Sequence, residues 1–109
     1  MTVQVQLTRI ELLPSGRLAL TLRDDPAGLC PYIYRAAAEI EWQPDQSRFI
    51  SPRPELGSPS THYVHVARAV RDELGYVLLS DASTEWVNVP PEERAVIEGH
   101  VAQRGSLLT

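Results

Sequence analysis

The sequence predicts an α+β fold in which an antiparallel or mixed β-sheet of about five to six strands is packed by two helices. Two observations carry this prediction. Period-two apolar alternation dominates the chain as far as Ile50, and helical apolar spacing appears twice in the remainder. The predicted order is a β-hairpin, two strands, a helix, two strands and a helix. A chain of 109 residues is one domain by length, so residues 1–109 are expected to form a single globular domain.

The N-terminal segment has the pattern of a β-hairpin. Apolar side chains alternate with polar ones over Val3–Leu7 and again over Leu18–Leu22. Over Ile10–Leu12 the alternation is shifted by one residue, which predicts a β-bulge near residues 8–9. Residues 13–16, Leu-Pro-Ser-Gly, fit a type I turn between the two strands.

The middle of the chain is predicted to continue the sheet. Asp24–Gly28 is a loop by composition, and alternating apolar residues then favour one long strand over Tyr32–Trp42. A turn at residues 44–45 leads to a short return strand, Arg48–Ile50. Residues 51–60 contain three of the nine prolines, so a surface loop is expected there.

Helical spacing begins after this loop. Ser60 or Thr61 is placed to cap a helix, and Gly75 is placed to end it in a left-handed conformation. The apolar residues expected to face the core are Tyr63, Val66, Ala67, Val70 and Leu74.

Two short strands and a second helix complete the predicted order. Tyr76–Leu79 has the composition of a buried strand, residues 81–83 of a turn and residues 84–89 of a further strand. Pro91 suits the first position of a helix, which Gly105 is expected to end. Glu92 and Glu93 in its first turn suit the positive end of the helix dipole. Ile97 and Val101 are expected to form its buried apolar stripe.

The charge balance argues against nucleic acid and membranes as partners. The net charge is −4, and all ten basic residues are arginines scattered among acids, whereas duplex-binding domains are basic and clustered. No apolar run reaches the ~20 residues of a membrane span, and the first residues lack the pattern of a signal peptide. The expected location is the cytoplasm, which agrees with a single cysteine, Cys30.

Two pairs of polar residues and the single cysteine are candidates for parts of a metal or catalytic site. His62 and His65 could share a metal, but no nearby acid completes a site, so two exposed side chains on the outer helix face are expected. Glu39 and Glu41 on one strand face stand ~7 Å apart, too far to share a proton without a third partner. Cys30 has no neighbouring base, which favours a half-buried loop thiol. No catalytic residue, metal or cofactor is predicted.

One helical face carries opposite charges. His65, Arg68 and Asp72 recur there at helical spacing. A solvated face with a local ion pair explains this set better than catalysis.

Aromatic residues supply the candidate binding site. Tyr32–Trp42 and Tyr76–Trp86 each begin with Tyr, carry Ala at the seventh place and end in Glu-Trp, so both tryptophans are expected to serve the same core or the same groove. Core packing is the favoured interpretation of these rings. The alternative is a pocket or partner groove formed by Tyr34, Trp42, Tyr63 and Trp86, with Arg53 at its rim.

Four stretches between residue 32 and residue 104 carry a resemblance to known proteins: Glu41-Trp42, residues 50–54, residues 69–75 and residues 84–90. Through them the chain resembles small bacterial proteins of unknown function that are carried as mobile gene cassettes, including integron cassettes. The last ~30 residues are also similar to some predicted toxin-immunity proteins, through structurally generic elements. Neither resemblance implies a catalytic residue or a cofactor.

Two hypotheses about function follow. The first is a non-enzymatic accessory protein that binds a protein partner or self-associates, most simply as a homodimer, since small domains with exposed strand edges often close them in this way. The second is a small-molecule-binding or enzymatic pocket lined by Tyr34, Trp42, Tyr63 and Trp86.

Overall fold

The secondary structure follows the predicted order. The computed structural model describes residues 3–33, 40–52 and 58–108, with side chains as far as residue 99. A short 3-10 turn, η1 (Cys30–Tyr32), separates the first two strands from the rest. The strands and long helices are β1 (Val3–Leu12), β2 (Leu18–Leu22), β3 (Glu41–Gln43), β4 (Arg48–Ile50), α2 (Pro59–Leu74), β5 (Tyr76–Leu79), β6 (Glu85–Val87) and α3 (Pro91–Leu108). The predicted α+β fold is confirmed.

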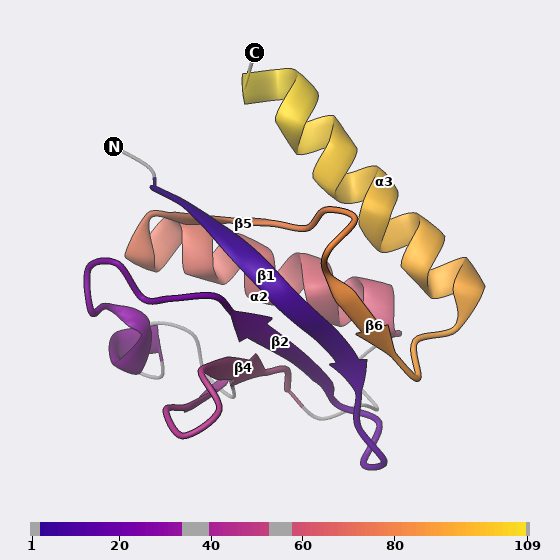
Figure 1. The fold of residues 1–109 in the computed structure, drawn as a ribbon, viewed down its shortest axis with the longest axis horizontal. Helices are drawn as coiled ribbons and strands as arrows, with labels where there is room; N and C mark the ends of the chain where they lie inside the picture. The colour runs from indigo at the N-terminus through magenta and orange to yellow at the C-terminus, as the bar shows by residue number, and fades with distance from the viewer. Residues whose placement is uncertain (1–2, 34–39, 53–57, 109) are drawn as a thin grey trace.

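The strands form one mixed sheet. Its order is β3-β4-β2-β1-β5, and β6 also pairs with β1. The pairs from β3 to β1 are antiparallel, whereas β5 and β6 both run parallel to β1. Helix α2 lies behind the sheet in Figure 1, and α3 lies beside β6 and packs against α2. The face of the sheet that is turned toward the viewer is covered by neither helix.

The β1–β2 hairpin has the predicted bulge and turn. The pairing register shifts between Leu7 and Arg9, where the sequence alternation changes phase. The N–H of Gly16 donates to the carbonyl oxygen of Leu13 at 2.8 Å, which closes the turn. Gly16 itself has a φ of 89°, a conformation that suits glycine.

Thr84 fills the break that this bulge makes in the sheet. β5 pairs with β1 as far as Gln6, and β6 resumes the pairing at Arg9. Between these two points the buried hydroxyl of Thr84 donates to the carbonyl oxygen of Leu7 at 2.8 Å and accepts from the N–H of Asp81 at 3.0 Å. A carbonyl at the bulge therefore keeps a hydrogen-bond partner inside the protein.

A row of large apolar side chains crosses the sheet on the face that α2 covers. The strand register joins five residues into this row, in the order Trp86, Ile10, Leu20, Phe49 and Trp42. Residues paired directly across neighbouring strands share one face of a sheet. The three inner residues are buried, and both tryptophans pack against the same core. The expectation that the two tryptophans serve one core is confirmed.

Helix α2 buries the predicted apolar stripe. All five residues expected to face the core are buried, as is His62, which was expected on the outer face of the helix. The N-cap is Ser58 rather than Ser60 or Thr61, because Pro59 occupies the first helical position and the side chain of Ser58 accepts from the N–H of Thr61. The helix ends as predicted at Gly75, whose φ is 73°.

The predicted strand over Tyr32–Trp42 is wrong at its start. Tyr32 ends the 3-10 turn, and Ile33 has helical backbone angles. Pro31 fixes a helical φ, and the carboxylate of Asp25 accepts from the N–H groups just before it, so local hydrogen bonds overcome the strand pattern. Residues 34–39 lie outside the described part of the chain, and the strand resumes only at Glu41.

The C-terminal elements differ from the prediction in their ends. Strand β6 stops at Val87 rather than residue 89, because Asn88 has a φ of 59° and turns the chain. Helix α3 begins at Pro91 as predicted but continues past Gly105 to Leu108. Glycine lowers helix propensity by about 1 kcal/mol, and this alone does not end a helix. Ile97 is buried as predicted.

Candidate functional site

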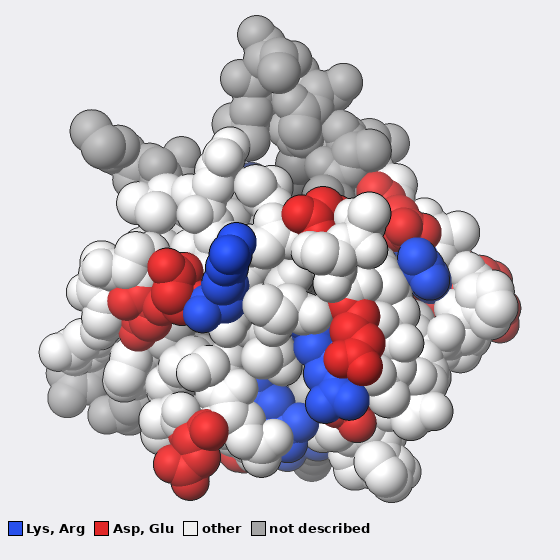
Figure 2. All heavy atoms as spheres, viewed as in Figure 1, with Lys and Arg blue, Asp and Glu red and all other residues white. Residues whose placement is uncertain are grey.

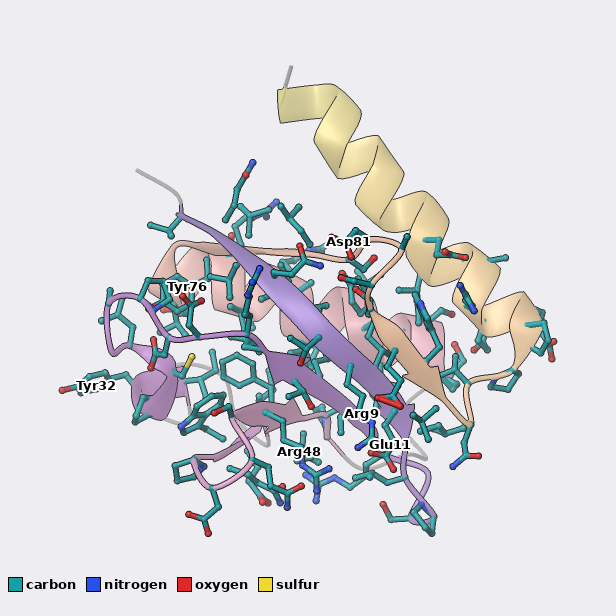
Figure 3. The ribbon with its side chains drawn as sticks, viewed as in Figure 1. Arg9, Glu11, Tyr32, Arg48, Tyr76 and Asp81 are labelled. Carbon is teal, nitrogen blue, oxygen red and sulfur yellow. The ribbon has the colours of Figure 1, made fainter. Side chains whose placement is uncertain are left out.

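The uncovered face of the sheet carries a continuous set of charged and amide side chains. We call it the outer charged face and define it as Arg9, Glu11, Glu41, Gln43, Arg48 and Glu85. It is the face seen in Figure 2, where acidic and basic side chains alternate over the sheet. Arg9, Glu11 and Arg48 lie close together near the C-terminal end of β1 in Figure 3.

Strand register places these residues side by side. Arg9 on β1 pairs with Glu85 on β6 and with Thr21 on β2, and Thr21 in turn pairs with Arg48 on β4. Arg48 is paired with Gln43 on the edge strand β3. One row across the sheet therefore brings together polar residues that lie up to 76 positions apart in sequence (Arg9 to Glu85).

Ion pairs and hydrogen bonds connect this row to the next. Arg9 lies 3.5 Å from the carboxylate of Glu85 and 3.9 Å from that of Glu11, and Arg48 lies 3.7 Å from Glu11. The Nε of Arg48 donates to Oε1 of Gln43 at 2.6 Å. The network ends with the amide of Gln43, which donates to Oε2 of Glu41 at 2.8 Å.

The network lies flat on the sheet. The side chains of Arg48 and Glu11 are only 15% and 20% exposed, although no described helix covers them. Ala19 and Ile50 pair in the adjacent row of the same face and are buried. Long charged side chains bury apolar neighbours beneath their aliphatic stems while their charged ends stay in water. The result is a preformed, mixed-charge surface.

The aromatic candidate residues do not gather in one place. Trp42 contacts Phe49 with ring centroids 4.9 Å apart, at the β3 edge of the sheet. Trp86 lies beneath the guanidinium of Arg94, 4.9 Å away, at the β6 edge. Four strand spacings separate the two edges, about 19 Å. Tyr63 is buried in the core, and Tyr34 and Arg53 lie outside the described residues.

A partly buried cluster around Asp25 holds the loop after β2 to β5. The hydroxyl of Tyr76 donates to Asp25 at 2.5 Å, and the N–H groups of Leu29 and Cys30 donate to the same carboxylate at 2.9 and 3.1 Å. Burial alone raises the pKa of Asp25, but the hydrogen bonds from Tyr76, Cys30 and Leu29 outweigh it and leave the pKa below its ordinary value.

The same cluster makes Cys30 a structural residue. Cys30 is fully buried, rather than half-buried as expected from its loop position. Burial, and then the negative charge of Asp25, raise the pKa of the thiol far above its usual value. A protonated thiol is a weak nucleophile, so this arrangement does not favour covalent chemistry.

Two sequence expectations on α2 change with the structure. His62 is buried, and its Nε2 has no hydrogen-bond partner within the described part of the chain, whereas His65 is exposed. Asp72 pairs with Arg71 at 3.1 Å, so the ion pair expected between Asp72 and Arg68 is not the one formed. Among the residues that the structure describes, no three His, Cys, Asp or Glu side chains are grouped to hold a metal ion.

Comparison with known proteins places this chain in a family. No family model matches it, and no curated protein matches it. A solved structure from the mobile metagenome of the North West Arm sewage outfall, the integron cassette protein Hfx_Cass5, is 31% identical to it. The alignment covers 94% of this chain and 99% of that one. The chain belongs to the family of this integron cassette protein. The two structures superpose with a TM-score of 0.43, so the relation rests on sequence identity and shared length.

The resemblance to integron cassette proteins that was inferred from the sequence is thereby confirmed. Hfx_Cass5 is described by its origin in an integron cassette and not by an activity. Within the described part of this chain, no helix is both long and apolar enough to cross a membrane.

The outer charged face of this chain could be predicted only in part from its sequence. The phase shift after Leu7 places Arg9 and Glu11 opposite the apolar face, and the position of Glu41 on a polar strand face is also readable. Pairing of Arg48 and Glu85 with them depends on strand order, which periodicity does not give.

Proposed function

We propose that this protein acts by protein association and that its outer charged face binds a second copy of the same chain. The observation that carries the proposal is the network from Glu85 across the sheet to Glu41, held by three ion pairs and two side-chain hydrogen bonds on a face that no described helix covers. No catalytic step is part of the proposal.

Preorganisation is the first physical support. Association costs free energy for every long side chain that has to be immobilised, roughly 0.5–1.5 kcal/mol each. Arg9 and Arg48 are already held in place by Glu11, Glu85 and Gln43. A partner that meets this face therefore loses less side-chain entropy than it would on an ordinary arginine-rich surface.

Charge complementarity is the second support and selects the partner. In a twofold interface, a residue i of one copy that contacts a residue j of the other is matched by a second contact of j with i, and only residues at the axis meet their own copies. The outer charged face offers two cations and three anions, so an arginine of one copy can face a glutamate of the other. The chain as a whole has a net charge of −4, and a mixed face is where two acidic copies repel each other least.

Sedimentation velocity tests the proposal on the intact protein. The wild type is expected to form a dimer with a dissociation constant on the order of micromolar, weakened by high salt because the contacts are polar. Arg48→Glu is expected to weaken it roughly tenfold or more, because a like charge then faces the partner.

Arg71→Glu is the matched control. It changes the charge equally, but Arg71 lies on α2 and pairs with Asp72, away from the outer charged face. Its dimer is expected to match that of the wild type. A monomer at every concentration, or an equal effect of both substitutions, would contradict the proposal.

A further inference from the structure

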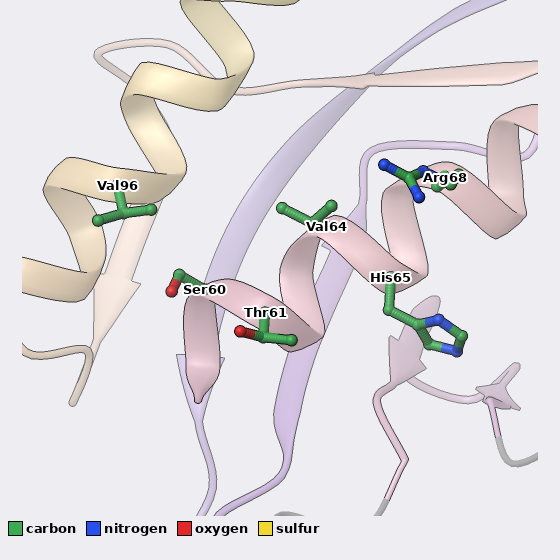
Figure 4. Close-up of a pocket in the computed structure, with 6 residues that line it drawn as sticks. All are labelled: Ser60, Thr61, Val64, His65, Arg68 and Val96. Carbon is green, nitrogen blue, oxygen red and sulfur yellow. The ribbon is translucent and has the colours of Figure 1, made fainter. Parts of the chain in front are cut away.

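A groove runs between α2 and α3, away from the outer charged face. It is a shallow groove, largely open to solvent, with a volume of about 400 Å³. Five lining residues come from successive turns of α2 and one from α3, as Figure 4 shows: Ser60, Thr61, Val64, His65, Arg68 and Val96. A volume of this size is within the range of small-molecule sites.

The groove has an apolar middle. Val64 is half-buried against the core, and Val96 of α3 is 54% exposed, an unusual degree for a large apolar side chain in this protein. Ser60, Val64 and Arg68 are spaced four residues apart, so they lie along one face of α2. From Ser60 to Arg68 the helix rises about 12 Å, which sets the length of the groove.

The two ends of the groove differ in charge. At the α2 N-terminal end, the carboxylate of Glu93 accepts from the hydroxyl of Ser60 at 3.2 Å and from its N–H at 3.3 Å. At the other end, Arg68 has no carboxylate partner in the described part of the chain, and Asp72 pairs with Arg71. Figure 4 shows the Arg68 guanidinium on the same side of α2 as Val64, with the His65 ring turned elsewhere.

We propose that this groove binds a small amphipathic carboxylate, with its apolar body between Val64 and Val96 and its carboxylate on the guanidinium of Arg68. A guanidinium fork matches a carboxylate in geometry and charge. Glu93 excludes a second anion from the opposite end, which fixes the direction of the ligand. Glu93 already accepts from the hydroxyl and the N–H of Ser60, which leaves it fewer free acceptor positions for an ammonium group.

The experiment compares two probes of matched length, hexanoate and hexylamine, by NMR on the full chain. Hexanoate is expected to shift the methyl resonances of Val64 and Val96 in a saturable way, with a dissociation constant on the order of 1 mM for so small a ligand. Hexylamine is expected to shift them less, because Arg68 repels its ammonium group and Ser60 already occupies acceptor positions of Glu93 at the other end.

Two variants separate the groove from general charge effects. Arg68→Gln is expected to weaken the binding of hexanoate by up to roughly fivefold, the upper end for an ion pair at a solvent-exposed site. Arg71→Gln removes the same charge from the same helix without touching the groove and is expected to bind as the wild type does.

Three results would overturn the proposal: no saturable shift with hexanoate, equal shifts with hexylamine, or equal weakening in both variants. None of them bears on dimer formation, since Arg68 and Val96 are not part of the outer charged face. The failure of one proposal is therefore distinguishable from the failure of the other.

Discussion

Trp42 and Trp86 stand at the two ends of a single cross-strand row, with three buried residues between them. Each tryptophan covers one edge of the same core, Trp42 against Phe49 and Trp86 beneath Arg94. The two rings therefore belong to the same core row without touching each other, and their separation of about 19 Å is too long for one small pocket lined by both.

Distance between the tryptophans predicts additive effects on stability. Trp42→Phe and Trp86→Phe are each expected to lower the free energy of unfolding by about 1 kcal/mol, because each removes part of a half-buried ring. The double variant is expected to equal the sum within about 0.5 kcal/mol, as is usual for distant sites. Urea unfolding of the four proteins measures this. A larger coupling energy would place the rings in contact or in a shared cavity.

Thr84 is expected to matter for its hydroxyl rather than its size. Thr84→Val keeps the shape but leaves the N–H of Asp81 without its acceptor and the carbonyl oxygen of Leu7 with only the bond that it accepts from the side chain of Gln6 at 3.2 Å. The expected loss is about 1–3 kcal/mol in the free energy of unfolding. Thr84→Ser retains both bonds and should lose less. If serine and valine cost the same in denaturant titrations, the bond across the bulge is unimportant.

The hydrogen bond from Tyr76 to Asp25 predicts a pH dependence. The folded pKa of Asp25 is lowered, so its ionised form stabilises the protein fully above the unfolded pKa, and this contribution is lost as pH falls through the folded pKa. Tyr76→Phe removes the largest of the interactions that lower this pKa. The expected results are a higher pKa for Asp25, acid unfolding that begins at higher pH, and about 1–2 kcal/mol less stability at neutral pH.

Asp25→Asn provides the control for this prediction. With no carboxylate at position 25, adding Tyr76→Phe should leave the shape of the acid unfolding curve unchanged, because the titrating group is already absent. Circular dichroism across the acid range follows both curves. If Tyr76→Phe in the otherwise wild-type chain does not change the pH at which acid unfolding occurs, the hydrogen bond from Tyr76 does not set the pKa of Asp25.

The thiol of Cys30 is expected to be unreactive toward thiol reagents in the folded protein. Its side chain is fully buried, and burial raises the pKa of its thiol, so both access and thiolate are lacking. A disulfide reagent at neutral pH should react with it only as fast as the protein opens. The reaction should accelerate in urea in parallel with unfolding. Rapid labelling of the native protein would contradict this placement.

Local patterns in the sequence predicted the elements whose own residues determine them. The bulge in β1 was readable from the phase change after Leu7, and the end of α2 from Gly75, since each depends on backbone geometry at one place. The structure of the segment that begins at Tyr32 was not readable from its own pattern. The carboxylate of Asp25 accepts hydrogen bonds from the backbone just before Pro31, and the resulting turn takes the place of the expected strand. Ser58 followed by Pro59 is typical of a helix N-terminus, but the prolines of residues 51–60 led to the prediction of a loop through both residues.

The candidate site was less predictable because strand order creates it. Arg9 and Glu11 could be placed on a polar face from alternation, but their partners Arg48 and Glu85 come from strands that only the tertiary fold brings alongside. The aromatic candidate residues stood out in the sequence, but those that the structure describes pack in or against the core and do not form one binding site.

The most direct test of self-association is a charge-swap mixture followed by sedimentation. One variant carries Arg9→Glu and Arg48→Glu, which makes the outer charged face wholly acidic, and the other carries Glu11→Arg and Glu85→Arg, which makes it predominantly basic. Each variant alone is predicted to be a monomer through like-charge repulsion, and the equimolar mixture is predicted to form a heterodimer. Monomers in the mixture, under conditions where both variants are folded, would contradict association through this face.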